Sequence, residues 1–511
     1  MKERTETTVS GIFRLTLVII AVVLQVSLII VLVLLLRSRA VYIYFFIQFI
    51  ALVDIIFLAG RKNNRSFIIA WLIVISILPV FGHILYILWG RCPSHDFRSR
   101  KMNESINRGK KFLDKKSGVY AELGEKHPER KRISGYLGRQ GFPLYKNTKC
   151  EYFPLGELKF AAILKDLENA KKYIFLEYFI LRNGKIWDSI EEVLLRKAKE
   201  GIEVKLLFDD LGSLSVLSAN FLKRLGSQGI QIKRFNPVHR HLSQLHLNHR
   251  NHQKITVIDG VIGYTGGTNL GDEYANLFVK YGHWKDTGIR MEGDAVWSLT
   301  VSFLQMWDSE SRTYSDYETY RAEHSITENG FFQPFIDGPM NNPDNPAEVM
   351  YRKLIYNAKE YLYITSPYLV IDNTMMDALC NAAMSGTDIR IITPKIWDQW
   401  YVHMVTQANY GELLKAGVRI YEYTPGFMHA KTIISDDDQV ITGTINMDYR
   451  SFYLHYENGV WICGDPVVKE IKKDLLDTLA LCEEIKLEDW IKRPLSVKCL
   501  GILMRLFAVL F

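Results

Sequence analysis

Three long apolar runs dominate the first part of the chain. They extend over Ile12–Leu36, Val41–Ala59 and Phe67–Trp89. Each run is close to the roughly 20 apolar residues that cross a bilayer as one helix. The first run is too long for the apolar core of a signal peptide, and no small-residue cleavage site follows it. We therefore expect residues 1–92 to form a transmembrane region of two or three helices.

A basic stretch separates these runs from the rest of the chain. Between Ser94 and Lys131 charged residues are frequent and large apolar residues are few. This composition indicates a juxtamembrane linker, or a solvated helix at the membrane surface, over residues 93–131. Its excess of Lys and Arg predicts a cytoplasmic location for the domain that follows. The short basic link Arg61–Arg65 would then lie on the opposite side, against the same rule, so the number of spans stays open.

From residue 132 onward, short apolar runs alternate with amphipathic stretches of helical length. Such an alternation indicates a sheet that is covered by helices on both faces. The pattern occurs twice, because three segments recur: Ala170–Leu176 as Ala358–Ile364, Gly201–Leu207 as Gly386–Ile392, and Gly229–Pro237 as Gly417–Pro425. We predict an α/β fold with two pseudo-symmetric halves, 132–333 and 334–485, each a mixed sheet flanked by helices. The carboxyl-terminal segment 486–511 is apolar with a few basic residues, which favours an interfacial amphipathic helix over an ordinary packed one.

Each half contains one copy of the same short motif, in which His-x-Lys is followed by four residues and Asp. A glycine turn and an asparagine come next, at the same distance in both copies. The residues concerned are His252, Lys254, Asp259 and Asn269 in the first half, and His429, Lys431, Asp436 and Asn446 in the second. Because a pseudo-twofold axis brings equivalent positions together, we expect the two motifs to form a single site.

Two imidazoles and two ammonium groups around one space suit a phosphodiester, with the asparagine amides as further hydrogen-bond donors. One neutral histidine can attack phosphorus, and the other can transfer a proton to and from oxygen. The nucleophile needs an acceptor at its second ring nitrogen. Asp286 and Glu457 follow the two motifs, and we expect Asp286 to orient His429 and Glu457 to orient His252. No carboxylate cluster argues for a metal, so we predict neither metal nor cofactor.

An insertion in the first half, Val238–Asn248, contains several basic and aromatic nitrogen groups. They are His239, Arg240, His241 and His246. Zinc is the weakest interpretation, because no cysteine or acidic ligands lie at zinc spacing. A basic loop over an anionic substrate and a plain solvated loop are the two stronger ones.

Composition adds little to this picture. The chain has 511 residues and a net charge of +7, which fits either an anionic partner or ordinary solubility. The six cysteines are scattered without CxxC spacing, as is typical of a reducing compartment.

The doubled motif resembles that of the phospholipase D superfamily, and the resemblance to bacterial cardiolipin synthases is closer still. The segments that carry it are Leu85–Gly90, Leu176–Ile180, Leu247–Gly260, Tyr264–Tyr274, Trp284–Thr287, Met428–Lys431 and Gly443–Ser451. The departures are an additional apolar run at the amino terminus and Gln253, where Arg is common. The resemblance covers essentially the whole chain and implies two phospholipase D-like halves.

The resemblance implies that a phosphatidyl group moves from one phosphatidylglycerol to another, with release of glycerol. His252 would be the nucleophile and His429 the acid and base. Phosphate would be bound by Lys254, Lys431, Asn269 and Asn446. Asp259 and Asp436, although part of the catalytic motifs, would orient or stabilise them rather than react. The expected partners are phosphatidylglycerol and cardiolipin in the cell membrane, with a multi-pass anchor and a cytoplasmic catalytic domain. Nucleic acid is not expected, because no basic track is interleaved with aromatic residues. The oligomeric state stays open, and the alternative activity is a phospholipase D-type hydrolase that releases phosphatidic acid.

Overall fold

The computed structural model describes residues 20, 23–24, 26–27, 30–31, 40–60, 65–87, 97–113, 117–213, 219–237, 248–341, 344–506 and 508. The first predicted span, Ile12–Leu36, lies largely outside these residues. The loop with His239, Arg240, His241 and His246 lies outside them as well.

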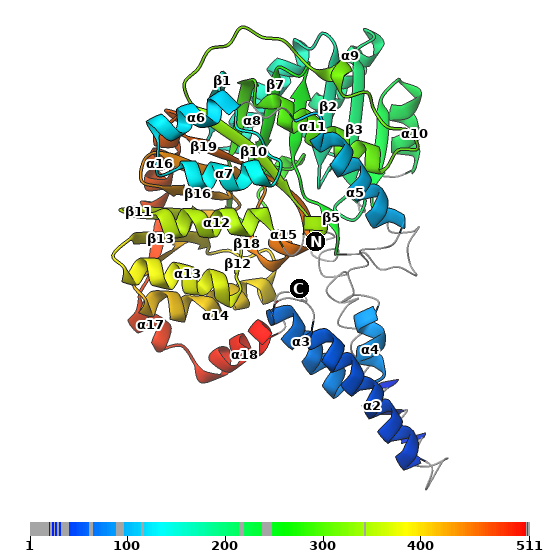
Figure 1. Ribbon diagram of the computed structural model, residues 1–511, viewed down its shortest axis with the longest axis vertical. Coiled ribbons are helices and arrows are strands. Elements are labelled where there is room, and N and C mark those ends of the chain that lie inside the picture. The colour runs from blue at the N-terminus through cyan, green and yellow to red at the C-terminus, as the bar shows by residue number, and fades with distance from the viewer. Residues whose placement is uncertain are drawn as a thin grey trace.

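The two predicted halves are present as two sheets with the same strand order (Figure 1). The first sheet follows the order β1-β9-β7-β6-β2-β3-β4, and the second follows β10-β19-β17-β16-β11-β13-β14 and ends with β20. The strands of the first sheet are β1 (Thr148–Phe153), β2 (Tyr173–Tyr178), β3 (Glu203–Asp209), β4 (Gln231–Phe235), β6 (Ile255–Ile258), β7 (Ile262–Gly266) and β9 (Gly288–Gly293). Those of the second are β10 (Phe331–Asp337), β11 (Tyr361–Thr365), β13 (Asp388–Pro394), β14 (Arg419–Tyr423), β16 (Thr432–Ser435), β17 (Gln439–Gly443), β19 (His455–Cys463) and β20 (Cys482–Ile485).

Both sheets are mixed, as predicted. In the first, β2, β3 and β4 run parallel, whereas β6, β7 and β9 pair in antiparallel fashion. The second sheet repeats this arrangement with β11, β13 and β14 and with β16, β17 and β19. Five short strands of the described residues lie outside these runs: β5 (Arg250–Asn251), β8 (His283–Lys285), β12 (Leu369–Val370) with β18 (Met447–Asp448), and β15 (Gly426–Met428).

The two sheets share one apolar core. It combines side chains from both sheets with α11 (Val296–Ser309), a helix whose residues are all buried. The outer face of the first sheet packs on α8 (Gly156–Glu168), α9 (Lys185–Lys199) and α10 (Ala219–Ser227). The outer face of the second packs on α12 (Pro346–Asn357), α13 (Asn373–Met384) and α14 (Trp400–Lys415). The remaining helices of these halves are α15 (Tyr449–Tyr453), α16 (Val467–Leu479), α17 (Leu487–Ile491), α18 (Leu495–Leu506), η4 (Asp272–Ala275), η5 (Glu318–Tyr320) and η6 (Pro339–Asn341).

The segment expected as a linker over 93–131 is instead largely packed. It contains α5 (Phe97–Lys110) and α6 (Ser117–Lys126), and α7 (Lys131–Arg139) follows. Helix α5 lies against α11, where Met102 and Ile106 enter the shared core and the Ser105 hydroxyl donates to the Gln305 carbonyl at 2.6 Å. The buried side of α5 carries only a few apolar residues, Met102 and Ile106, together with small ones such as Ser105. The many Lys and Arg residues of this segment outweigh them in its composition, so the sequence did not predict that this side is buried.

The amino-terminal region forms helices that project from one end of the molecule (Figure 1). They are α2 (Ala40–Ala59), α3 (Arg65–Ile77) and α4 (Phe81–Leu85). Among the described residues, the part of α2 from Val41 to Ala59 is long and apolar enough to cross a membrane, and α3 is a shorter apolar helix. The run predicted over Phe67–Trp89 is therefore divided, because the chain turns at Leu78–Val80 around Pro79 before α4 begins.

Candidate active site

The first motif reaches its position through a strand of the other half. Strand β5 pairs in parallel with the beginning of β19, and the His252 amide then donates to the Tyr456 carbonyl at 2.8 Å. The imidazole Nδ1 lies 2.8 and 3.0 Å from the two carboxylate oxygens of Glu457 on β19. The first histidine is thus held, by backbone and by side chain, against the second half.

The second motif repeats this arrangement in the opposite direction. Strand β15 pairs in parallel with β8 of the first half, and the His429 amide donates to the Lys285 carbonyl at 2.7 Å. Nδ1 of His429 lies 2.6 Å from a carboxylate oxygen of Asp286, the residue that follows β8. Each histidine is therefore paired with an acid from the other half, which is the crossed arrangement expected from the repeat.

Both acids are themselves held in place. Glu457 is fully buried and accepts hydrogen bonds from the Ser451 hydroxyl at 2.7 Å and from the Thr444 hydroxyl. Asp286 accepts from the Thr287 amide at 2.9 Å. A Cβ atom on Gly267 would lie 2.0 Å from the Asp286 carboxylate, so the glycine turn of the first motif leaves room for this acid. Gly267 after the first motif and Thr444 after the second therefore help to position the two carboxylates.

Burial and nearby positive charge favour the neutral form of both histidines. Burial lowers the pKa of His429 to about 4, and the Lys431 ammonium adds to this although Asp286 opposes it. Burial and the ammonium groups of Lys254 and Lys431 lower the pKa of His252 well below its usual range. Burial alone would raise the pKa of Asp286, but the hydrogen bond from His429 and the charge of the nearby Lys431 hold it below its ordinary value.

The two lysines lie beside the histidine of their own motif. The Lys254 ammonium donates to the His252 carbonyl at 2.6 Å, and the Lys431 ammonium donates to the His429 carbonyl. Burial lowers the pKa of Lys254, and that of Lys431 to about 8. An anion that enters this space would favour the charged form of each lysine, so the site is built to bind a phosphate together with protons.

The two asparagines lie in the shell around the histidines. The Asn269 amide donates to the Tyr274 hydroxyl at 2.9 Å, and the Tyr274 ring lies 5.6 Å from the His429 ring. Asn446 lies next to Asp448, and its Oδ1 is buried without a hydrogen-bond partner among the residues that the structure describes. This position of the Asn446 side chain is available to a ligand, as an acceptor or, if the amide is rotated by 180°, as a donor.

The two motif aspartates lie at the far end of their strands. The Asp259 carboxylate accepts from the backbone amides of Lys171, Lys172 and Tyr173 at 2.7–2.9 Å. Asp436 binds the equivalent amides, Lys359–Tyr361, in the second half. Both adopt positive φ, at 54° and 53°. These two residues belong to the framework that holds the motif strands and not to the group of side chains around the histidines.

Several side chains at the site were not singled out by the sequence. Phe179 and His455 flank the His252 ring at centroid distances of 5.0 and 5.3 Å, and Trp284 lies 5.2 Å from the His429 ring. The buried Lys159 donates to the Thr268 hydroxyl at 2.7 Å. Trp284 and His455 belong to segments that also contain Asp286 and Glu457, so proximity in sequence could have indicated them. Phe179 lies in the family-like segment Leu176–Ile180, whereas Lys159 carries no such signal.

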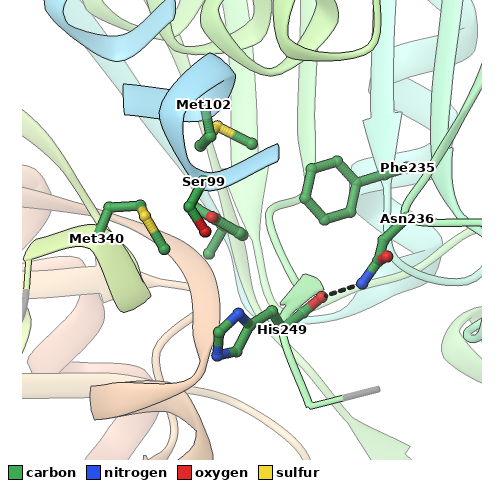
Figure 2. Close-up of a pocket in the computed structure, with 7 residues that line it drawn as sticks. Ser99, Met102, Phe235, Asn236, His249 and Met340 are labelled. Carbon is green, nitrogen blue, oxygen red and sulfur yellow. Dashed lines mark hydrogen bonds between the residues drawn. The ribbon is translucent and has the colours of Figure 1, made fainter. Parts of the chain in front are cut away.

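A small cavity lies beside the segment that leads into the first motif. Figure 2 shows Ser99 and Met102 of α5 on one side and Phe235, Asn236 and His249 on the other. Its volume of about 20 Å³ suits one water molecule and not a lipid headgroup. The Asn236 side chain donates to the His249 carbonyl at 2.9 Å, which holds the chain just before β5.

One group of potential metal ligands occurs in the described part of the site. The ligand atoms of His252, His455 and Glu457 lie within 4.8 Å of one another. The Arg450 guanidinium donates to His455 Nε2 at 3.2 Å, and two lysines lie nearby. So much positive charge opposes a cation, and it suits an anionic ligand.

Two equivalent halves that share a doubled His-Lys site define a phospholipase D-like enzyme. Comparisons with known proteins agree. The family described as "Cardiolipin synthase, PLD-like domain" matches residues 163–278 and 351–478, and the one described as "Phospholipase D-nuclease N-terminal" matches residues 46–91. The chain belongs to the cardiolipin synthase family, and it is therefore a phospholipid phosphatidyltransferase of the membrane.

Individual relatives span nearly the whole chain. Cardiolipin synthase 1 of Staphylococcus aureus (strain COL) is 35% identical over 470 residues, which cover 89% of this chain and 93% of that protein. The cardiolipin synthase of Listeria monocytogenes serotype 4a (strain HCC23) is 32% identical over 463 residues, with coverage of 89% and 95%. The crystal structure of phosphatidylserine synthase from Haemophilus influenzae Rd KW20 shares the fold, with a TM-score of 0.59 at 14% identity, over 75% of this chain and 99% of that one.

Proposed function

We propose that this enzyme makes cardiolipin and glycerol from two molecules of phosphatidylglycerol through a phosphohistidine on His252. The observation that carries the proposal is the crossed pairing of His252 with Glu457 and of His429 with Asp286, beside two buried lysines. The names of the relatives supply the lipid class, and the site supplies the chemistry.

The first step is an in-line displacement at phosphorus. The Nδ1–H group of His252 donates a hydrogen bond to the Glu457 carboxylate, so the lone pair on Nε2 is free to attack. A bond forms between Nε2 and phosphorus while the bond to the glycerol headgroup oxygen breaks. His429, protonated once the phosphate anion is bound, gives its Nε2 proton to that oxygen, and glycerol leaves. The Lys254 and Lys431 ammonium groups stabilise the charge on the equatorial oxygens.

The second step reverses the roles. The now neutral His429 takes the proton from a free hydroxyl of a second phosphatidylglycerol. That oxygen attacks phosphorus, the bond to His252 breaks, and cardiolipin forms. Asp286 holds the His429 ring in one tautomer through both proton transfers.

The acceptor decides between synthesis and hydrolysis, because water could replace the second lipid at the same intermediate. The test is to incubate the purified chain in vesicles with headgroup-labelled and acyl-labelled phosphatidylglycerol. Cardiolipin together with labelled glycerol is expected. Phosphatidic acid without cardiolipin would contradict the proposal and establish the hydrolase alternative.

The division of roles between the histidines has its own test. His252→Ala is expected to abolish any phosphatidyl-enzyme captured by acid quench, whereas His429→Ala slows the formation or the turnover of that adduct. His249→Ala is a matched control, since that imidazole lies three residues before the nucleophile. Capture of the adduct on His429 would reverse the assignment.

We further propose a multi-pass anchor with the catalytic domain in the cytoplasm. Support comes from the apolar helices α2 and α3 and from the basic residues that follow α4. Labelling of cysteines introduced at Lys62 and at Lys126 with a membrane-impermeant reagent tests this topology in intact cells. Reaction at Lys126→Cys without permeabilisation would contradict it.

A further inference from the structure

Three exposed apolar segments surround one side of the site. The loop after η4 presents Leu277, Phe278 and Val279, and Val279 is 75% exposed. The segment that enters α14 presents Ile396, Trp397 and Trp400, with the two indoles about half exposed. The outward side of α18 presents Leu495, Leu500, Ile502, Leu503 and Leu506. We call these three segments together the apolar rim. A surface of this kind is unfavourable in water unless it has a partner.

The first two segments of the rim lie beside one apolar cluster although they come from different halves. Tyr281, which closely follows the first segment, and Tyr368, which binds Asp398 of the second segment, both pack against that cluster. Asp398 accepts a hydrogen bond from the Tyr368 hydroxyl at 2.5 Å, and its charge also acts on Lys431. The first segment is connected to the site directly, because Tyr274 contacts the His429 ring. This part of the rim therefore borders the His429 side of the site.

Helix α18 continues the same surface. Its inward side packs on α14, and Met504 joins Val402 and Val405 in one apolar cluster that Ala508, just beyond the helix, also enters. Tyr368 belongs to the same contact cluster, so α18 is linked through α14 to the residues beside the site. Gly501 lies against Ala408, where a side chain would crowd the helices. One side of α18 is thus occupied by the protein, and the other is left exposed.

The membrane-anchoring helices reach the site from its other side. The Phe67 ring of α3 stacks on the Tyr449 ring of α15 with centroids 6.0 Å apart. Helix α15 begins after Asp448 and contains Ser451, which holds the Glu457 carboxylate. In Figure 1, α2, α3 and α18 all lie toward the same end of the long axis. The site consequently lies between the anchor and the apolar rim.

We propose that the apolar rim inserts into the surface of the bilayer and that the lipid diester reaches the histidines across it. The occupant is a bilayer that contains anionic phospholipid, because the chain is already anchored by α2 beside the same site. Tryptophan side chains are typical of the membrane interface. The basic residues Lys280, Lys498 and Arg505 lie in or next to the rim segments, where they suit the anionic headgroups of the bilayer. The inference rests on the proposed function only in that the substrate is a bilayer lipid.

A direct test of insertion needs no enzyme activity. A polarity-sensitive fluorophore is attached at Val279→Cys or at Leu503→Cys in the full chain with Cys92→Ser and Cys499→Ser, reconstituted into vesicles of phosphatidylglycerol and phosphatidylcholine. The control label is placed at Met384→Cys, which is also exposed and lies at the end of α13, shortly before β13 begins. Blue-shifted emission and quenching by lipids with a shallow spin label are expected at Val279 and Leu503 alone. Emission at both rim positions that matches the Met384 control would overturn the proposal.

A kinetic test separates lipid access from chemistry. Leu277→Ser/Phe278→Ser/Val279→Ser is compared with the control Tyr356→Ser/Met384→Ser, and the readout is total headgroup release, which is the same for synthesis and hydrolysis. With phosphatidylglycerol in vesicles the rim variant is expected to lose about tenfold or more of its rate. With a short-chain phosphatidylglycerol below its micelle concentration it should retain the wild-type rate. Equal losses on both substrates, or no loss on vesicles, would refute the role of the rim. Headgroup release is counted for synthesis and for hydrolysis alike. The comparison between vesicles and short-chain lipid therefore tests the rim even if the enzyme does not make cardiolipin.

Discussion

Replacing Glu457 by Gln tests the crossed carboxylate most directly. Glu457 is fully buried, and its oxygens contact His252 Nδ1 at 2.8 and 3.0 Å and the Ser451 hydroxyl at 2.7 Å. The hydroxyls of Ser451 and Thr444 can rotate to accept as well as donate, so the amide fits the same space. What the substitution removes is the negative charge that faces the imidazole.

The expected loss is large and falls on turnover. Removing one partner from a buried hydrogen-bonded charge pair costs about 2–5 kcal/mol, which corresponds to a rate loss of roughly 30-fold to several thousandfold. An amide nitrogen that faces Nδ1 also favours the tautomer with its proton on Nε2, where the nucleophilic lone pair is needed. We therefore expect kcat to fall about 10³-fold, with little change in KM, because the phosphate ligands are unchanged.

The assay is cardiolipin formation from labelled phosphatidylglycerol in vesicles, together with acid-quench capture of the phosphatidyl-enzyme. Glu191→Gln is the matched control, since Glu191 is a buried acid that binds the Trp187 indole and Arg224, away from the histidines. Adduct formation should be slow in Glu457→Gln and unchanged in Glu191→Gln. A Glu457→Gln enzyme with a third or more of the wild-type kcat would refute the reasoning.

Three further predictions follow from other contacts. Gly267→Ala places a Cβ 2.0 Å from the Asp286 carboxylate and should reduce kcat by about tenfold or more, whereas Gly118→Ala, in open space, should not; equal rates would contradict this. Asp259→Asn leaves three backbone amides with a weaker acceptor and should lower the free energy of unfolding by about 2–4 kcal/mol, seen as a lower Tm, while folded enzyme at low temperature keeps its kcat. The pKa of His429 is about 4 in the folded chain and 6.5 ordinarily, so the unfolded chain binds more protons between these values. The free energy of unfolding should then fall as pH falls through that window, by up to about 1.4 kcal/mol per pH unit and histidine, and His429→Asn should weaken this dependence in denaturant titrations.

The sequence was most informative where the repeat constrained it. Glycine stops such as Gly201 and Gly386 marked the strand starts in both halves, and the structure confirms the mixed sheets and their common order. The pairing of Asp286 and Glu457 with the opposite histidine could be anticipated because a pseudo-twofold axis relates equivalent segments. Local patterns were sufficient for these features, since each depends on residues close in sequence or on exact repetition.

Other features depend on contacts that no local pattern encodes. Helix α5 looks solvated by composition, yet Met102 and Ile106 enter the core because α11 supplies the complementary face. Lys159 lies at the site only through the packing of α8. The apolar rim likewise joins Val279, Trp400 and α18, which are far apart in the sequence. Apolar residues in loops were unremarkable until the fold placed them on elements that pack beside the site.

The same contacts that join the halves also deliver the histidines. The backbone pairs His252–Tyr456 and His429–Lys285 are short parallel extensions between the two sheets, and each ends at a histidine that we propose to react. The Asn458 side chain adds a hydrogen bond of 2.7 Å to the Thr265 hydroxyl between them. His252 and His429 each find their carboxylate partner in the other half. Relative displacement of the halves would therefore lengthen both pairs together, and the nucleophile and the proton donor would lose their orientation in the same movement. The pseudo-symmetry thus makes the rigidity of the interface, and not only the identity of the motif residues, a condition for catalysis.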